Sequence, residues 1–114
     1  MKILALDLGK YKTVFCEYDS MNGEHEFGKI KTTPQQIHEL MVEMEPERVV
    51  LEICTSAGWV VDIARVLDKE VEVANPLHEA WRWKNIKRKN DKEDALKLAK
   101  LSAMNQLPTV HIPE

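Results

Sequence analysis

The sequence predicts an α/β fold in which a mixed sheet is flanked by helices. The chain has 114 residues, which is the common size of one domain. Its N-terminal part holds three strand-like runs separated by turn residues, and the remainder alternates helical and strand-like patterns. A meander followed by such alternation is typical of an antiparallel half-sheet joined to a parallel half.

The N-terminal strands are expected at residues 2–8, 13–18 and 26–32. The first run, KILALDL, is almost continuously apolar and stops at Gly9, as a central strand does. The second and third runs are joined by the turn-rich segment 19–23. We therefore expect the three strands to form an antiparallel meander.

A first helix is expected to begin at Thr33 and to end before Pro46. Thr33 suits the N-cap and Pro34 the first helical position. Apolar residues then recur at helical spacing, namely Ile37, Leu40, Met41 and Met44.

The remaining pattern predicts a strand at 48–54, a helix at 56–67, a strand at 70–74 and a last helix at about 91–105. For this last helix, Asn90 is the expected N-cap and Glu93 stands at the capping-box position. The complete order of elements is that of the ribonuclease H-like architecture. No repeat or second domain is apparent in the sequence.

The net charge of −3 conceals an uneven distribution. Residues 1–80 carry 8 basic and 15 acidic residues, a net of −7, whereas residues 81–114 carry 8 and 4, a net of +4. A candidate nucleic-acid-binding segment combines cations, which contact phosphates, with indoles, which stack on unpaired bases. Its residues are Trp81, Arg82, Trp83, Lys84, Lys87, Arg88 and Lys89. The same segment could equally be a solvated charged surface with its indoles packed on the core.

Two acidic residues stand inside predicted central strands. Strand alternation places Asp7 on the face of Ile3 and Ala5, and Glu52 on the face of Val50. A carboxylate in such apolar surroundings must be paired, protonated or bound to a metal ion.

The last predicted helix supplies two further acids, Asp91 and Asp94, which share one helix face. Leu98, Leu101 and Asn105 continue that face, so we expect it to lean on the sheet. Four carboxylates could then converge at one edge of the sheet and hold Mg²⁺, which prefers oxygen ligands. Paired metal ions of this kind support in-line displacement at phosphorus, and so phosphodiester cleavage or strand transfer.

Other chemistries find no support in the sequence. Cys16 and Cys54 form no CxxC pair, and the histidines have no zinc-site spacing. The sequence also contains no GxxxxGK[ST] phosphate-binding loop. Because no apolar stretch approaches a membrane span and no signal peptide is evident, we expect a soluble cytoplasmic protein.

The acids and their surroundings resemble a known family. Asp7, Glu52, Asp91 and Asp94, within LALDLGKYKT, VVLEICTSAGW, VANP and KRKNDKEDALKLAKLSAM, are similar to the N-terminal catalytic domain of the DEDD transposases. These form the one-ten family of insertion sequences, which includes the Piv-type DNA invertase. The resemblance covers nearly the whole chain and implies that these four residues are catalytic and bind Mg²⁺ or Mn²⁺.

The same resemblance implies a RuvC-like domain that acts on branched or bridged DNA. It also implies that a structured guide RNA is a possible partner and that the full-length protein is a homo-oligomer. Family transposases continue into a second domain with a catalytic serine, and neither Ser56 nor Ser102 matches its setting. We therefore expect residues 1–114 to be a single catalytic domain, either a fragment or a stand-alone domain of a longer recombinase, that lacks the C-terminal serine-carrying domain. Lys-Asn-Asp at 89–91 replaces the family's usual Lys-Thr-Asp.

Two alternatives remain open at this point. One is a non-catalytic nucleic-acid-binding or dimerisation module with merely structural carboxylates. The other follows from the likeness of residues 7–13, DLGKYKT, to the first phosphate loop of sugar kinases and actin-like ATPases.

Overall fold

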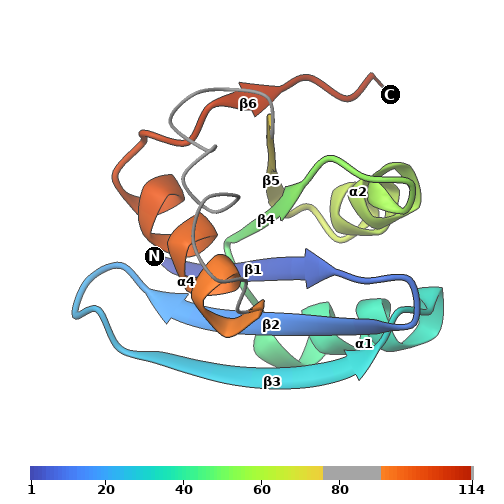
Figure 1. The fold of residues 1–114 in the computed structure, drawn as a ribbon, viewed down its shortest axis with the longest axis horizontal. Coiled ribbons are helices and arrows are strands. Elements are labelled where there is room, and N and C mark those ends of the chain that lie inside the picture. The colour runs from blue at the N-terminus through green and yellow to red at the C-terminus, as the bar shows by residue number, and fades with distance from the viewer. Residues whose placement is uncertain (76–90, 114) are drawn as a thin grey trace.

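A six-stranded sheet with the order β3-β2-β1-β4-β5-β6 forms the centre of the molecule (Figure 1). The computed structural model describes residues 1–75 and 91–113. The strands β1 (Lys2–Leu8), β2 (Lys12–Asp19) and β3 (His25–Lys31) pair antiparallel. The predicted N-terminal meander is therefore confirmed, and each boundary lies within one residue of the expected one.

The other half of the sheet is parallel except at its edge. The strand β4 (Arg48–Glu52) pairs parallel with β1, and β5 (Glu70–Ala74) pairs parallel with β4. The two-residue strand β6 (Thr109–Val110) pairs antiparallel with β5. The mixed sheet is thus confirmed, although β4 ends two residues before the predicted Cys54 and β6 was not predicted.

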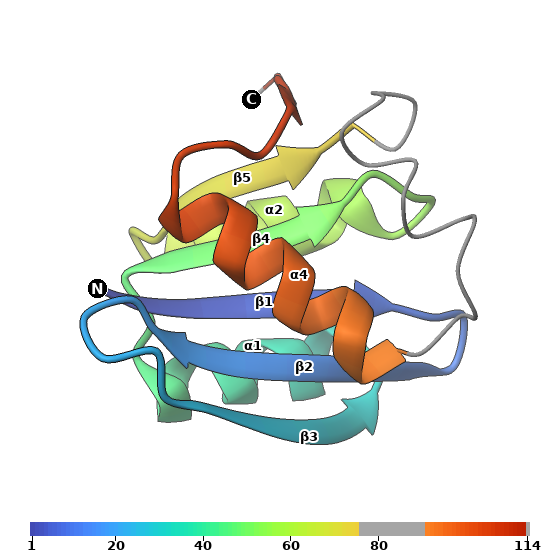
Figure 2. The same cartoon turned by 60° about the vertical axis from the view of Figure 1, so that its left-hand side comes forward.

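Helices cover both faces of the sheet (Figures 1 and 2). Among the helices of the described residues, α1 (Pro34–Met44) and α2 (Ala57–Val66) lie together on one face, and α4 (Asp91–Ala103) lies on the other. The face toward α1 and α2 carries the alternate strand residues Leu4, Leu6, Val49, Leu51 and Val73. The opposite face, toward α4, carries Ile3, Ala5, Cys16, Val50 and Ala74. Strand alternation therefore divides the core into two apolar layers.

The helix α4 crosses β1 and β2, as Figure 2 shows. Its buried stripe consists of Asp94, Ala95, Leu98, Ala99 and Ser102. Of the predicted stripe, only Asp94 and Leu98 belong to this buried stripe among the described side chains. Leu101 is half-buried and Asn105 is exposed beyond the helix end. The small side chains Ala95 and Ala99 face the sheet because they allow the helix to approach it closely.

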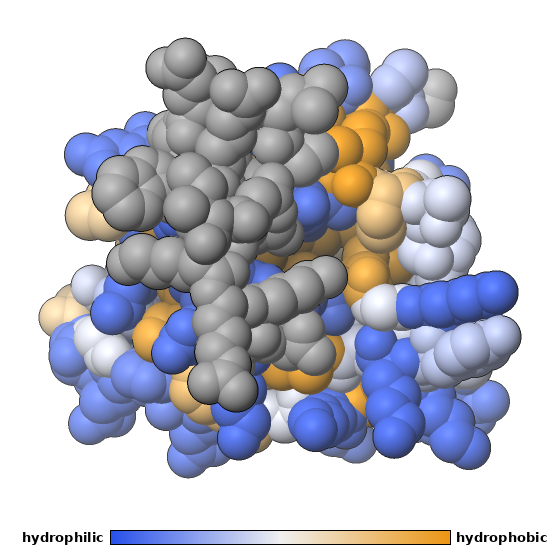
Figure 3. All heavy atoms as spheres, in the orientation of Figure 1, coloured by the Kyte–Doolittle hydropathy of each residue, from blue (hydrophilic) through white to orange (hydrophobic). Residues whose placement is uncertain are grey.

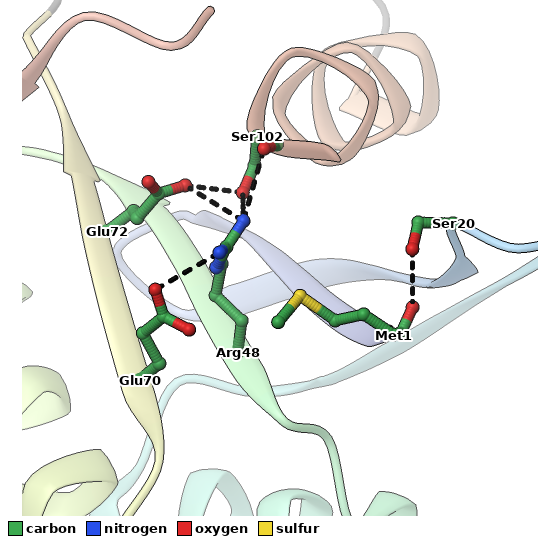
Figure 4. A network of polar contacts seen from close by, with 6 residues as sticks. All are labelled: Met1, Ser20, Arg48, Glu70, Glu72 and Ser102. Carbon is green, nitrogen blue, oxygen red and sulfur yellow. Dashed lines mark hydrogen bonds and ion pairs between the residues drawn. The ribbon is translucent and has the colours of Figure 1, made fainter. Parts of the chain in front are cut away.

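A polar network around the buried side chains of Arg48 and Ser102 ties the C-terminal end of α4 to the sheet (Figure 4). Arg48 Nη1 donates to the backbone oxygen and to Oγ of Ser102, each at 3.1 Å. Arg48 Nη2 donates to Glu70 Oε1 at 3.1 Å, and Ser102 Oγ donates to Glu72 Oε1. These contacts fix the position of α4 relative to β4 and β5.

None of the helices in the described residues is long and apolar enough to cross a membrane. The expected N-cap residue, Asn90, and the candidate DNA-binding segment 81–89 lie outside the described residues.

Candidate active site

Asp7 and Glu52 stand beside each other on neighbouring parallel strands. The β1–β4 register pairs Ala5 with Val50 and Leu6 with Leu51, and one further step brings Asp7 level with Glu52. Both acids alternate onto the face covered by α4, because Ala5 and Val50 belong to that layer. Neighbouring strands lie about 4.8 Å apart, so two half-buried carboxylates share one small region.

Asp94 belongs to the helix that covers this same face. It is 6% exposed and directly precedes Ala95, which packs on the sheet layer of Ala5 and Val50. Asp91 is the first residue of α4, and its side chain lies outside the described part of the chain. The end of α4 that carries both aspartates lies toward the carboxyl end of β1 (Figure 2).

The described side chains do not by themselves assemble a complete metal centre. Within residues 1–75 and 92–113, no group of three or more His, Cys, Asp or Glu side chains is close enough to hold a metal ion. The predicted convergence of four carboxylates therefore stays a prediction.

The interior beneath α4 is poorly solvated. Cys16 packs in the layer between β2 and α4 and is fully buried. Burial, with a smaller contribution from Glu17, raises the pKa of its thiol from 9.0 to about 11, against a lowering effect from Lys100. In such surroundings a cation beside carboxylates interacts more strongly with them than it would in water.

The donors offered by Asp7, Glu52 and Asp94 fit a hard divalent cation. All three are carboxylates, which suit Mg²⁺ and Mn²⁺, and the described residues bring no sulfur or imidazole ligand into the set. Mg²⁺ often takes only one or two protein carboxylates and fills its other positions with waters and substrate phosphates. Two adjacent acids with a third on the covering helix are compatible with that demand.

A group of lysines near the acids was missed by sequence reasoning. Lys12, Lys29 and Lys31 alternate onto the same sheet face as Asp7, toward the β3 edge. Their signal in the sequence is the absence of acidic residues from segments 8–16 and 27–38. Their common face depends on the pairing register, which the sequence pattern did not supply.

Comparison with known proteins reveals similarity of fold rather than of sequence. No family model matches the chain, and no curated protein matches it. Among solved structures, it is similar to T. thermophilus RuvC in complex with a Holliday junction substrate. The TM-score is 0.64 at 16% identity, covering 96% of this chain and 99% of that chain. A second structure of Thermus thermophilus RuvC gives a TM-score of 0.62 at 17% identity, with 96% and 100% covered.

Fowlpox virus resolvase in complex with Holliday junction DNA is also similar. It gives a TM-score of 0.50 at 14% identity and covers 90% of this chain and 73% of that chain. The predicted ribonuclease H-like fold is therefore confirmed, and within that architecture the chain has the RuvC-like fold.

Proposed function

We propose that the chain is a DNA-cleaving catalytic domain in which Asp7, Glu52, Asp91 and Asp94 hold Mg²⁺ or Mn²⁺. The observation that carries this proposal is the adjacency of Asp7 and Glu52 on the sheet face that α4 covers with the buried Asp94. Two acids side by side in an apolar layer are costly unless a cation or other partner offsets their charge.

Each described acid has a distinct part in this proposal. Asp7 and Glu52 project from central strands, so they would hold a divalent cation in a fixed place. Asp94 comes from the covering helix, whose small residues seat it close to the sheet. A bound divalent ion supplies charge stabilisation at phosphorus and lowers the pKa of a bound water.

DNA is the substrate that the fold favours. The similar RuvC and Fowlpox virus resolvase structures are complexes with Holliday junctions, and we extend branched DNA from them to this chain as a proposal. The basic and aromatic residues Trp81, Arg82, Trp83, Lys84, Lys87, Arg88 and Lys89 would contribute to binding.

The finer proposal rests on the resemblance to DEDD transposases. In that role the chain would cleave DNA and transfer strands during insertion-sequence transposition or site-specific recombination. Residues 1–114 would then act together with a serine-carrying domain, in a homo-oligomer and with a structured guide RNA.

Metal-dependent melting tests the proposal. At Mn²⁺ or Mg²⁺ concentrations about 100-fold above Kd, binding adds about 2.7 kcal/mol, which is a rise in Tm on the order of 10 °C for a chain of this size. Asp7→Asn and Asp94→Asn should abolish the rise. Asp62→Asn, an exposed aspartate on α2 at the opposite face, is the matched control and should retain it.

An unchanged Tm of the unsubstituted chain with either metal would contradict the proposal and favour a non-catalytic DNA-binding module. A rise with ATP in place of the metal would contradict it in favour of a phosphate-binding lobe.

A further inference from the structure

The cations of the N-terminal half are concentrated in two segments that pair with each other. Residues 1–80 have a net charge of −7, yet segments 8–16 and 27–38 contain no acidic residue. Their four basic residues are Lys10, Lys12, Lys29 and Lys31. The first segment leads into β2 and the second includes the end of β3, so the sheet brings the lysines together.

The register sets two of these lysines directly against each other. Lys12 is the cross-strand partner of Lys31, so both side chains lie on the same face. Lys29 pairs with Val14 and lies on that face as well. All three are exposed, and within the described residues none forms an ion pair with an acid. Like charges directly opposite each other destabilise a sheet, so this arrangement has a cost that no ion pair among the described residues offsets.

Local hydrogen bonds hold the pair in place. The Gly9 amide donates to the Lys12 carbonyl at 3.0 Å, and the Thr32 amide donates to the Tyr11 carbonyl at 2.9 Å. The hydroxyls of Thr13 and Thr32 share a hydrogen bond of 2.8 Å. A Cβ at Gly9 would lie 2.5 Å from the Lys12 oxygen, so the tight turn requires glycine. The two ammonium groups therefore extend from a fixed base.

The lysines lie in line with the candidate acids. Asp7 pairs with Val14, and Val14 pairs with Lys29, so one row across the sheet runs from Asp7 to Lys29. Two strand spacings, about 10 Å, separate the backbones of these residues. The pair of Lys12 and Lys31 forms the next row toward the end of the sheet where β1 stops.

We infer that Lys12, Lys29 and Lys31 form a phosphate-binding track that guides the backbone of a DNA strand toward Asp7 and Glu52. This inference rests on the proposed function, because the track is expected to lead the DNA to Asp7 and Glu52 only if these acids take part in its cleavage. A polyanion neutralises the opposed lysines, and the held turn limits the conformational freedom lost on binding.

Protection of an edge strand is the competing explanation. β3 is an edge of the sheet, and lysines commonly protect such edges from pairing with another chain. Hydrophilic residues line the lower margin of the face seen in Figure 3, where β3 and α1 lie. Lys12, however, belongs to β2, which has strands on both sides. Edge protection does not account for a lysine there, opposite a second lysine.

Binding to a fluorescent four-way DNA junction in EDTA at several NaCl concentrations tests the track. Lys12→Gln/Lys31→Gln should weaken binding on the order of tenfold. The negative slope of log K against log[NaCl] should become shallower by about 1.8, which is about 0.9 for each of the two lost phosphate contacts. Lys69→Gln/Lys100→Gln makes the same charge change at sites outside the track and should leave both values unchanged. Lys12→Arg/Lys31→Arg should retain the affinity.

Three results would overturn the track. They are an equal loss of DNA affinity in the Lys69/Lys100 control, unchanged DNA affinity in the Lys12/Lys31 glutamine variant, and a loss of DNA affinity in the arginine variant. Self-association of the glutamine variant with unchanged DNA affinity would also overturn it, in favour of edge protection. The metal proposal is tested separately by the Mn²⁺-dependent rise in Tm. If the unsubstituted chain shows no rise but binds DNA through these lysines, the track stands and the cleavage proposal fails.

Discussion

Arg48 connects more parts of the molecule than its position on a short strand suggests. It is 9% exposed, and its guanidinium contacts Ser102 at the end of α4 and Glu70 and Glu72 on β5 (Figure 4). The planar guanidinium satisfies several acceptors at once, which a lysine ammonium does not do with the same geometry. Arg48 therefore sets where α4, and with it Asp94, lies on the sheet.

Arg48→Ala should lower the free energy of unfolding by about 2–3 kcal/mol, because it leaves the buried acceptors of Ser102 and the half-buried carboxylate of Glu72 without their charged donor. Glu70→Ala, which removes a half-exposed partner of the same arginine, should cost less than about 1 kcal/mol. Urea unfolding followed by circular dichroism measures both. Equal costs for the two variants would show that Arg48 acts only through its surface ion pair.

The two cysteines should differ sharply in reactivity. Cys16 is buried with the pKa of its thiol raised to about 11, and Cys54 is exposed. At pH 8, a thiol-alkylating reagent should modify native protein at Cys54 and reach Cys16 only after unfolding. Peptide mass spectrometry identifies the modified residue, and comparable labelling of Cys16 in the native protein would contradict its burial.

The raised pKa of Cys16 also has a consequence for stability. The folded thiol keeps its proton to higher pH than the unfolded thiol, so its stabilising contribution is complete below pH 9 and is lost as pH rises through about 11. Urea unfolding at pH 8 and pH 10.5 should show a larger fall in stability for the unsubstituted chain than for Cys16→Ala.

Sequence patterns found the acids more readily than the lysines. Asp7 and Glu52 were predictable because a charged residue in an apolar strand is conspicuous by itself. The opposition of Lys12 and Lys31 depends on how the β2–β3 hairpin is paired, and surface lysines are too common to be conspicuous. Asp94 was placed on the core-facing side of its helix, and its burial agrees with that prediction.

At the level of elements, α1 shows how local chemistry fixes a boundary. Thr33 is the N-cap, and its hydroxyl oxygen accepts a hydrogen bond of 3.2 Å from the backbone N–H of Gln36. The Gln36 side chain in turn accepts from the Lys31 amide at 2.8 Å. These two bonds join the end of β3 to the start of α1, and they explain why the Thr33–Pro34 signal was reliable.

Thr33→Ala should lower the free energy of unfolding by about 1 kcal/mol, because the cap of α1 is lost. Thr33→Ser keeps the hydroxyl and should restore most of that loss. Thermal unfolding of both variants measures the difference, and equal destabilisation by serine and alanine would show that the methyl group rather than the cap matters.

The elements that sequence reasoning misplaced have few local signals. β6 has only two residues, too few for any alternation to be recognised, and it forms where the chain returns beside β5. The stripe of α4 was only partly predicted, because the face of Asp94 was continued to Leu98, Leu101 and Asn105. In the structure Ala95 and Ala99 are fully buried, and Leu101 packs on the same layer only partly buried. Close packing on the sheet favours the smaller side chains, which is a tertiary effect.

At the scale of the whole molecule, the division of the sheet into two faces explains where function could arise. Two helices cover one face over a mainly apolar layer. The other face is covered by α4 within residues 1–75 and 91–113, and it combines apolar residues with Asp7, Glu52 and Asp94 near one end. The lysines Lys12, Lys29 and Lys31 continue this face toward the β3 edge, so acids and cations share one surface.

The central claim is that carboxylates distant in sequence hold a divalent cation on this face. Diffraction from crystals soaked in Mn²⁺, recorded for anomalous signal, locates such an ion. We expect a peak at the end of β1 with oxygens of Asp7 and Glu52 as ligands, at about 2.0–2.2 Å, and with Asp94 on the same ion or its waters. A fully occupied peak elsewhere, or none at this place in a crystal that binds Mn²⁺, would contradict it.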